Sequence, residues 1–446
     1  MSIDTRIRTE SVARETAILV GVYLDGESRG GSRVADCVGD PLDELAGLAE
    51  AAGVRELGRI IQRRRKPEGA TYIGRGKLAE LKEQVDAADA NVVIFDNNLA
   101  PSQTKNLEEE LKVKVIDRTE LILDIFASRA QTSEARLAVE LAQLEYSLPR
   151  LKRMWTHLER QAVGGVGLRG PGEKQLEVDR RLAQKRVIDL KSELHAIHQR
   201  RKREVAARKT SRTLSLVGYT NVGKSTLLNR LTDSDVYVKD QLFATLDTRT
   251  RRWSLPGWGP VLLSDTVGFI KNLPHHLVAS FRATLEEANQ TDLLLHVADA
   301  SSAEVNEQIA AVYEVLTDLG IREKDTILVL NKTDALESTE VLTVLLERYP
   351  NAVPISARIG TGLELLTARV SETLSKEFFD LVVTMPIGNG RLEALLAREG
   401  EVLSSEYDET SAVIRCRIPQ HVLGQLRREK NVKIEGLPEE KKSDWE

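Results

Sequence analysis

The stretch GYTNVGKST (Gly218–Thr226) decides the fold of the chain around it. It fits the pattern G-x-x-x-x-G-K-[ST] and stands between a short apolar run, Thr213–Val217, and a helical pattern. In such a loop the glycines let backbone N–H groups curl around phosphate oxygens, and the next helix adds positive potential at its N-terminus. The stretch predicts a phosphate-binding loop made of Gly218, Tyr219, Thr220, Asn221, Val222, Gly223, Lys224, Ser225 and Thr226.

Two side chains of this loop carry the chemistry. We expect Lys224 to reach the β- and γ-phosphates and to be catalytic, because its charge stabilises the negative charge that develops during phosphoryl transfer. The hydroxyl of Ser225 is expected to ligate Mg²⁺. A strand before the loop and a helix after it predict an α/β domain with a doubly wound sheet.

Three later motifs specify the nucleotide as guanine. The pattern D-x-x-G fits Asp265-Thr266-Val267-Gly268, where Asp265 is expected to hold Mg²⁺ and the N–H of Gly268 to sense the γ-phosphate, so that Gly268 is a second catalytic candidate. The pattern N-K-x-D fits Asn331-Lys332-Thr333-Asp334, and its Asp presents two acceptor oxygens to a donor pair that guanine has and adenine lacks. The third motif, Ser356-Ala357-Arg358, matches the S-A-x element that braces the base with a backbone N–H.

Each of these motifs follows an apolar run of strand character. These runs are Val261–Ser264, Thr326–Leu330 and Val353–Ser356. Together with a further run, Leu293–Ala298, they alternate with helical patterns. Ligands of open α/β sheets bind at the carboxyl ends of the strands, where all of the motifs would meet. We therefore expect a Ras-like G domain over residues 212–378 that hydrolyses GTP to GDP and phosphate with Mg²⁺. A further threonine that binds Mg²⁺ only in the triphosphate state is expected within residues 243–250, and spacing alone leaves its identity open.

The first part of the chain alternates strand and helix as well. Strand patterns cover 17–24, 54–61, 91–95 and 112–116, and helical patterns cover 41–52, 77–88 and 101–111. This alternation predicts a small α/β domain over residues 16–118 with a partly parallel sheet, after a flexible N-terminus over residues 1–15.

Residues 119–211 have a different pattern. Apolar residues, most of them leucines, recur at alternating steps of four and three from Leu137 to Leu158 and again from Ala183 to Ile197. A segment with five glycines, 164–172, separates these two leucine-rich stripes. We expect a long antiparallel helical hairpin with a glycine-rich tip. Residues 150–212 contain 18 basic and 7 acidic side chains, although the whole chain has a net charge of −5. This basic block indicates a polyanionic partner, and the alternative is a solvated helical face.

Residues 379–446 predict a small α+β domain with a strand (381–385), a helix (391–398), a hairpin (402–407 with 412–418) and a second helix (421–428). The chain has no apolar run long enough to span a bilayer and no apolar signal segment, and its two cysteines are too far apart for a disulfide framework. We expect a cytoplasmic monomer with no integral membrane association and no DNA partner.

The motifs together resemble the HflX family of bacterial GTPases, within the Obg/HflX-like branch. The resemblance is carried by GYTNVGKST, FATLD (Phe243–Asp247), DTVGF (Asp265–Phe269), NKTD and SAR, and outside the G domain by GGVGLRGPGEKQLEVDRR (Gly164–Arg181) and YIGRGKLAEL (Tyr72–Leu81). It implies that Thr245 is the catalytic switch I residue that ligates Mg²⁺. It also implies that Phe243, Ala244, Thr245, Leu246 and Asp247 contact the nucleotide.

The resemblance implies a role in translation. Proteins of this family bind the large (50S) ribosomal subunit, and members split stalled ribosomes under stress, with the hairpin tip reaching into ribosomal RNA. Two alternatives stay open from the sequence: a ribosome-assembly GTPase, and an RNA-remodelling ATPase that acts through the N-terminal half.

One position departs from Ras-like GTPases, which place Gln after D-x-x-G to orient the attacking water. This chain has Phe269 there, which neither donates nor accepts a hydrogen bond. We therefore expect slow intrinsic hydrolysis, with the water positioned by another residue or by the ribosome.

Overall fold

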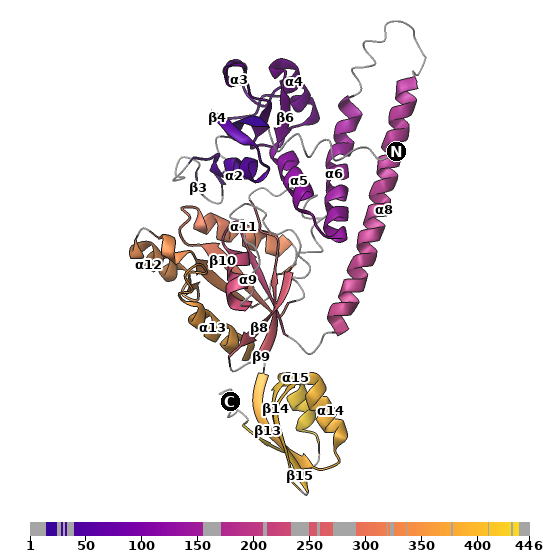
Figure 1. The fold of residues 1–446 in the computed structure, drawn as a ribbon, viewed down its shortest axis with the longest axis vertical. Coiled ribbons are helices and arrows are strands. Elements are labelled where there is room, and N and C mark those ends of the chain that lie inside the picture. The colour runs from indigo at the N-terminus through magenta and orange to yellow at the C-terminus, as the bar shows by residue number, and fades with distance from the viewer. Residues whose placement is uncertain are drawn as a thin grey trace, which may run out of the picture.

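The computed structural model describes residues 15–24, 28–29, 32–33, 40–154, 171–207, 212–232, 249–256, 259–270, 291–318, 320–321, 325–336, 338–375, 378–408, 410–429 and 431–436. Three domains follow one another along the long axis of the molecule, and a pair of long helices runs beside the first two (Figure 1). This is the mixed, multidomain α/β architecture that the sequence predicts.

The N-terminal domain is built on a four-stranded sheet of order β4-β1-β5-β6. Its strands are β1 (Thr16–Leu24), β4 (Arg55–Arg64), β5 (Val92–Phe95) and β6 (Lys114–Asp117). All three strand pairs are parallel, so the sheet is wholly rather than partly parallel. Such a sheet is normally covered on both faces, and the burial of every residue from Ala17 to Tyr23 agrees with that rule.

Helices cover the two faces of this sheet. On one face, buried side chains of α3 (Arg75–Ala88) and α4 (Pro101–Leu111) pack on alternate residues of β1 such as Ile18 and Val20. On the other face, α2 (Asp43–Ala51) and α5 (Arg118–Arg129) pack on Ala17 and Leu19. A two-stranded ribbon of β2 (Ser28–Arg29) and β3 (Ser32–Arg33) completes the described part of the domain.

The two long helices are α6 (Ser133–Met154) and α8 (Pro171–Ala207). They lie side by side, and the end of α6 and the beginning of α8 are at the same end of the pair, so the helices are antiparallel (Figure 1). Their seam is closed by buried Ala138, Leu141, Leu190 and Leu194, members of the two predicted leucine stripes or their neighbours. The predicted glycine-rich tip lies outside the described residues, except for Pro171 and Gly172 in the first turn of α8.

The G domain has a six-stranded sheet of order β12-β11-β10-β7-β9-β8. The strands are β7 (Thr213–Gly218), β8 (Arg249–Leu255), β9 (Gly259–Asp265), β10 (Leu293–Asp299), β11 (Thr326–Asn331) and β12 (Val353–Pro354). The helices are α9 (Lys224–Thr232), α11 (Val305–Asp318), α12 (Thr339–Arg348) and α13 (Leu363–Ser375), with a 3-10 turn, η2 (Thr333–Ala335). Only β8 is antiparallel to its neighbour, and it is the strand that the sequence reading missed.

The C-terminal domain contains β13 (Phe378–Pro386), α14 (Gly390–Glu399), β14 (Glu401–Tyr407), β15 (Ser411–Pro419), α15 (Gln420–Leu426) and β16 (Lys433–Glu435). Its sheet is antiparallel with the order β14-β15-β13-β16, the arrangement of a split βαβ motif. The predicted α+β class is confirmed, and β16 is an additional strand.

The N-terminal domain and the G domain share one hydrophobic core cluster. It includes Leu45 of α2 and Phe126 of α5 together with Val217 of β7 and Tyr219 of the predicted phosphate loop. A continuous apolar core between domains opposes their independent motion, which is otherwise the default for domains in one chain. Among the helices that the structure describes, none combines the length and the hydropathy that a membrane span needs.

The seam of the helix pair leads to a test of its packing. Leu190→Ala removes a fully buried side chain from the seam and is expected to destabilise the pair by about 2–5 kcal/mol. Amide hydrogen exchange in peptides from α6 and α8 should become faster. The matched control is Ile188→Ala, because Ile188 is two residues away and 67% exposed. Equal protection in both variants would contradict the described seam.

Candidate functional site

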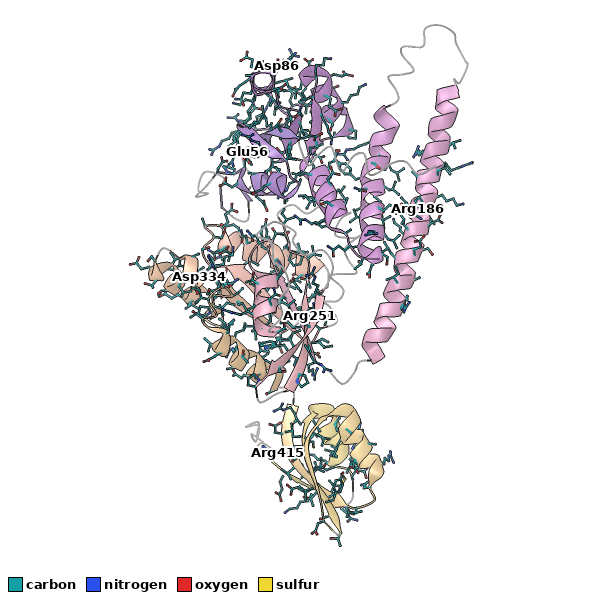
Figure 2. All side chains as sticks on the ribbon, in the orientation of Figure 1. Glu56, Asp86, Arg186, Arg251, Asp334 and Arg415 are labelled. Carbon is teal, nitrogen blue, oxygen red and sulfur yellow. The ribbon has the colours of Figure 1, made fainter. Side chains whose placement is uncertain are left out.

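The predicted motifs meet at the carboxyl ends of the G-domain strands. Gly218 ends β7, Asp265 ends β9 and Asn331 ends β11. These three strands run parallel within one sheet, so their ends share one edge. Figure 2 marks Asp334 in the half of the G domain that lies nearer the N-terminal domain.

The loop from Gly218 to Gly223 needs its glycines for space and for backbone conformation. Gly218 and Gly223 have positive φ values of 150° and 92°. A Cβ on Gly218 would lie 2.1 Å from the carbonyl oxygen of Val297, and one on Gly223 would lie 2.4 Å from Nδ2 of Asn331. Asn221 also adopts a left-handed conformation, which Asn tolerates better than most residues. The loop is therefore packed closely against β10 and β11, and side chains at positions 218 and 223 would disturb it.

Lys224 is buried under the loop with 7% of its surface exposed. Its Nζ donates hydrogen bonds to the carbonyl oxygens of Gly218 (3.1 Å) and Tyr219 (2.7 Å). Burial lowers the pKa of Lys224 to about 8, and the negative charge of Asp265 acts in the opposite direction. The amine is therefore fixed by the same loop whose backbone would surround a phosphate.

The oxygen atoms expected to hold Mg²⁺ lie next to each other. The Ser225 hydroxyl donates to Oδ2 of Asp265 over 2.5 Å, and Asp265 is fully buried. A hydroxyl and a carboxylate are both ligands that Mg²⁺ prefers, and Mg²⁺ is typically held in nucleotide sites by one or two such groups plus phosphates. The donor set therefore fits Mg²⁺. The third expected ligand, Thr245, lies outside the described residues together with Phe243, Ala244, Leu246 and Asp247.

Gly268 brings the D-x-x-G segment close to the phosphate loop. A Cβ at this position would lie 2.8 Å from Cα of Thr220 and 2.9 Å from Nζ of Lys224. The next residue fastens the two segments, because the N–H of Phe269 donates to Gly218 O (3.0 Å) and the N–H of Thr220 donates to Phe269 O (2.7 Å).

The side chain of Phe269 packs in the hydrophobic core and does not face the phosphate loop's surroundings as a polar group would. Its side chain is 3% exposed and belongs to the hydrophobic core. The side chain that replaces the Gln of Ras-like proteins is thus buried, and only its backbone borders the phosphate loop.

Asn331 and Ser356 organise the part of the site that is expected to bind the base. Nδ2 of Asn331 donates to Val222 O in the phosphate loop (2.8 Å), and its Oδ1 accepts from the N–H of Ala357 (2.9 Å). The Ser356 hydroxyl donates to Oδ1 of Asp334 over 2.6 Å. These bonds bring the phosphate loop, N-K-x-D and S-A-x into one unit and orient the carboxylate of Asp334.

Two features of the site were not found from sequence. Lys332, in a left-handed conformation, forms an ion pair with Asp299 at the end of β10 (2.7 Å), and Asp299 belongs to none of the nucleotide motifs. Tyr219 of the phosphate loop donates a hydrogen bond to Glu44 in α2 of the N-terminal domain. No motif in the sequence signals this contact, which joins residues 175 positions apart.

A buried histidine lies behind the phosphate loop. His296 is on β10, is 1% exposed and makes an edge-to-face contact with Tyr313 (ring centroids 5.0 Å apart). Burial, with the nearby charge of Lys224 acting in the same direction, lowers the pKa of His296 to about 3. The folded protein therefore keeps this imidazole neutral over the whole range between pH 3 and the pKa of an unfolded histidine, which is about 6.5.

The difference between the folded and unfolded pKa of His296 makes the free energy of unfolding depend on pH. As pH falls below about 6.5, the unfolded chain binds a proton at His296 that the folded chain does not bind, so the free energy of unfolding decreases until pH reaches the folded pKa. At about pH 5 the loss from this residue is about 2 kcal/mol. Urea unfolding at about pH 7.5 and about pH 5 should show that His296→Leu loses about 2 kcal/mol less than the unchanged protein. The same loss in both proteins would show that His296 is protonated in the fold.

Comparisons with known proteins agree with the motifs. Family models described as "GTP-binding GTPase N-terminal", "GTP-binding GTPase Middle Region" and "50S ribosome-binding GTPase" match residues 39–127, 129–208 and 213–332. The chain is 44% identical over 411 residues to the GTPase HflX of Escherichia coli (strain K12), a match that covers 91% of this chain and 94% of that relative. It is 42% identical over 418 residues to the GTPase HflX of Lacrimispora saccharolytica, covering 92% and 95%.

A solved structure of a GTP-binding protein from the archaeon Sulfolobus solfataricus, in complex with GDP, is 25% identical and covers 81% of this chain and 99% of that chain. The TM-score of this match is 0.43. The sequence matches extend over the N-terminal domain, the helix pair and the G domain. The chain therefore belongs to the HflX family of GTPases, and its reaction is the hydrolysis of GTP to GDP and phosphate.

Proposed function

We propose that this GTPase binds the large ribosomal subunit and its RNA, splits or rescues stalled ribosomes, and uses GTP hydrolysis as the timer for its release. Membership of the HflX family supports a ribosome-associated GTPase, and the family model that matches residues 213–332 is described as a 50S ribosome-binding GTPase. The same proposal takes the protein to be a cytoplasmic monomer.

The observation that carries the nucleotide chemistry is the joining of three loops by the Asn331 side chain. In the proposed mechanism, Asp334 and Asn331 select guanine, and Ser356 holds the Asp334 carboxylate toward the base. Lys224 and the loop N–H groups stabilise the charge that develops on the phosphates. Ser225, Asp265 and Thr245 are the residues that would hold Mg²⁺, which when bound neutralises phosphate charge.

The surface that carries the ribosomal part of the proposal is on α8. Arg180, Arg181 and Lys185 are exposed there, while Arg186 and Lys191 are paired with Glu140 and Glu145 of α6 across the seam. The pair therefore uses some basic residues for its own packing and leaves others at the surface. Exposed basic residues on a projecting helix bind the phosphates of RNA with a strong dependence on salt.

The burial of Phe269 supports stimulation by the partner. A core side chain is not available to orient a water molecule, so the isolated protein lacks the usual group from this position. GTP turnover at fixed salt should therefore be low for the protein alone and should rise strongly with purified large subunits. Lys224→Ala provides the blank. GTP turnover that large subunits do not change, or turnover that depends instead on free RNA or on ATP, would contradict the translational role. The assignment of the GTP site would still stand.

A charge-reversal set tests the surface. We expect Arg180→Glu, Arg181→Glu and Lys185→Glu together to remove most of the stimulation by large subunits while turnover of the isolated protein stays the same. The matched control reverses three exposed basic residues in other places, Lys112, Arg348 and Arg391, and changes the net charge equally. Equal loss of stimulation in both sets would show that general charge, and not α8, attracts the ribosome.

A further inference from the structure

A chain of polar contacts connects the phosphate loop to the interior of the N-terminal domain. The hydroxyl of Tyr219, the second residue of the loop, donates to Oε1 of Glu44 in the first turn of α2. Oε2 of the same carboxylate pairs with Arg118 over 2.9 Å. Arg118 in turn donates to Oδ1 of Asp96 over 2.5 Å. Four side chains therefore connect the nucleotide site to the N-terminal sheet.

The side chains in this series of contacts are mostly buried. The side chains of Arg118 and Asp96 are 4% and 2% exposed, that of Glu44 is 22% exposed, and Tyr219 is 5% exposed. Asp96 follows β5 and Arg118 follows β6, so the ion pair stands on two adjacent strand ends of a parallel sheet. Hydrogen bonds to charged groups in such surroundings are stronger than exposed ones, and a buried charge that loses its partner is costly. The arrangement therefore holds the Tyr219 hydroxyl in one place.

The backbone of Tyr219 is part of the catalytic loop. Its carbonyl oxygen accepts the hydrogen bond from Nζ of Lys224, and Tyr219 forms a β-bridge with Phe269. A displacement of the Tyr219 side chain would therefore move the group that holds Lys224 and the segment that carries Gly268. Binding of nucleotide is tighter when such a loop is ordered beforehand, because less entropy is lost on binding.

The neighbouring strand end holds the helix pair. Asp117, the last residue of β6, accepts a hydrogen bond from the hydroxyl of Tyr146 and pairs with Arg150, both over 2.7 Å. Tyr146 and Arg150 belong to α6. Of the two consecutive residues Asp117 and Arg118, Asp117 contacts the helix pair, and Arg118 contacts Glu44, the partner of Tyr219.

We propose that Glu44 and Arg118 of the N-terminal domain are positioning residues for the GTP site, which they hold in its binding-competent form through the hydroxyl of Tyr219. The proposal rests on GTP binding at the loop Gly218–Thr226 and adds that the N-terminal domain sets the affinity of that loop for nucleotide. Coupling of this kind is reciprocal, so nucleotide also stabilises the docking of the N-terminal domain.

The test is a double-mutant cycle on the full chain. The dissociation constant of GDP carrying a fluorescent N-methylanthraniloyl group is measured, well below the unfolding temperature, for the unchanged protein, Tyr219→Phe, Glu44→Ala and the double variant. Each single change should weaken binding by about fivefold or more, the lower range of typical coupling between sites. The double variant should be no more than about twofold weaker than the weaker single variant, because both changes remove the same contact.

Two controls match the two changes. Asp43→Ala removes the adjacent acidic side chain of α2, which is 65% exposed and pairs with Arg59 instead. Tyr407→Phe removes a hydroxyl that also donates to a glutamate, Glu393, in the C-terminal domain. Both controls should bind the labelled GDP as the unchanged protein does. Tyr219→Phe keeps the aromatic ring in the core, so it decides the question even if Glu44→Ala does not fold.

The outcomes separate this inference from the function on which it rests. Single variants that bind as tightly as the unchanged protein, or single effects that multiply in the double variant, would overturn the inference while GTP binding stands. An unchanged protein that binds the labelled GDP no better than Lys224→Ala would overturn the nucleotide site itself, and the inference with it.

Discussion

The carboxamide of Asn331 is the constraint on which the rest of the site depends. The residue is 2% exposed, and each of its two polar atoms is used by a different loop: Nδ2 by Val222 O and Oδ1 by the N–H of Ala357. The same Nδ2 lies only 2.4 Å from the position that a Cβ on Gly223 would take. One side chain therefore holds the loop Gly218–Gly223 against the loops that are expected to bind the base, and it leaves room only for a glycine at position 223. An unsatisfied buried amide would cost free energy in any other arrangement of the three loops.

The N-terminal domain contacts the G domain through both apolar and polar groups. Its helices α2 and α5 contribute to the same core cluster as Val217 and Phe269 of the G domain. The ion pair between Arg118 and Asp96 lies at the strand ends of its sheet, where ligands of α/β folds usually bind. In this protein that edge contacts Tyr219 of the neighbouring domain and the C-terminal half of α6, so the sheet connects the proposed nucleotide site to a basic helix pair.

Sequence reasoning found the elements whose side chains repeat with a clear period or match a motif. The strands that precede each nucleotide motif are short apolar runs, and the leucine stripes of α6 and α8 are regular, so these elements were predicted. Strand β8 was missed because five of its seven residues are exposed or charged and only Trp253 and Leu255 are buried in it. Strand β16 was missed because three residues, Lys433–Glu435, carry too little pattern to recognise.

The contacts between domains could not be predicted from the sequence, for a different reason. Glu44 resembles any acidic residue in the first turn of a helix, and Arg118 resembles any basic residue after a strand. Their roles exist only because tertiary packing brings them to Tyr219, and no local rule reports such a contact. The same holds for Asp299, which became a partner of Lys332 through the parallel pairing of β10 with β11.

The central claim is that these loops form one site that selects guanine through Asp334. The most direct measurement is the displacement of labelled GDP from the full chain by unlabelled GTP, ATP and xanthosine triphosphate, repeated with Asp334→Asn. The account predicts that GTP outcompetes ATP by on the order of 10⁴-fold, because adenine leaves the two acceptor oxygens of Asp334 without donors. It also predicts that Asp334→Asn transfers this preference from GTP to xanthosine triphosphate, whose base presents an acceptor where guanine has its amine. Displacement by ATP as effective as by GTP, or an Asp334→Asn protein that still prefers GTP, would contradict it.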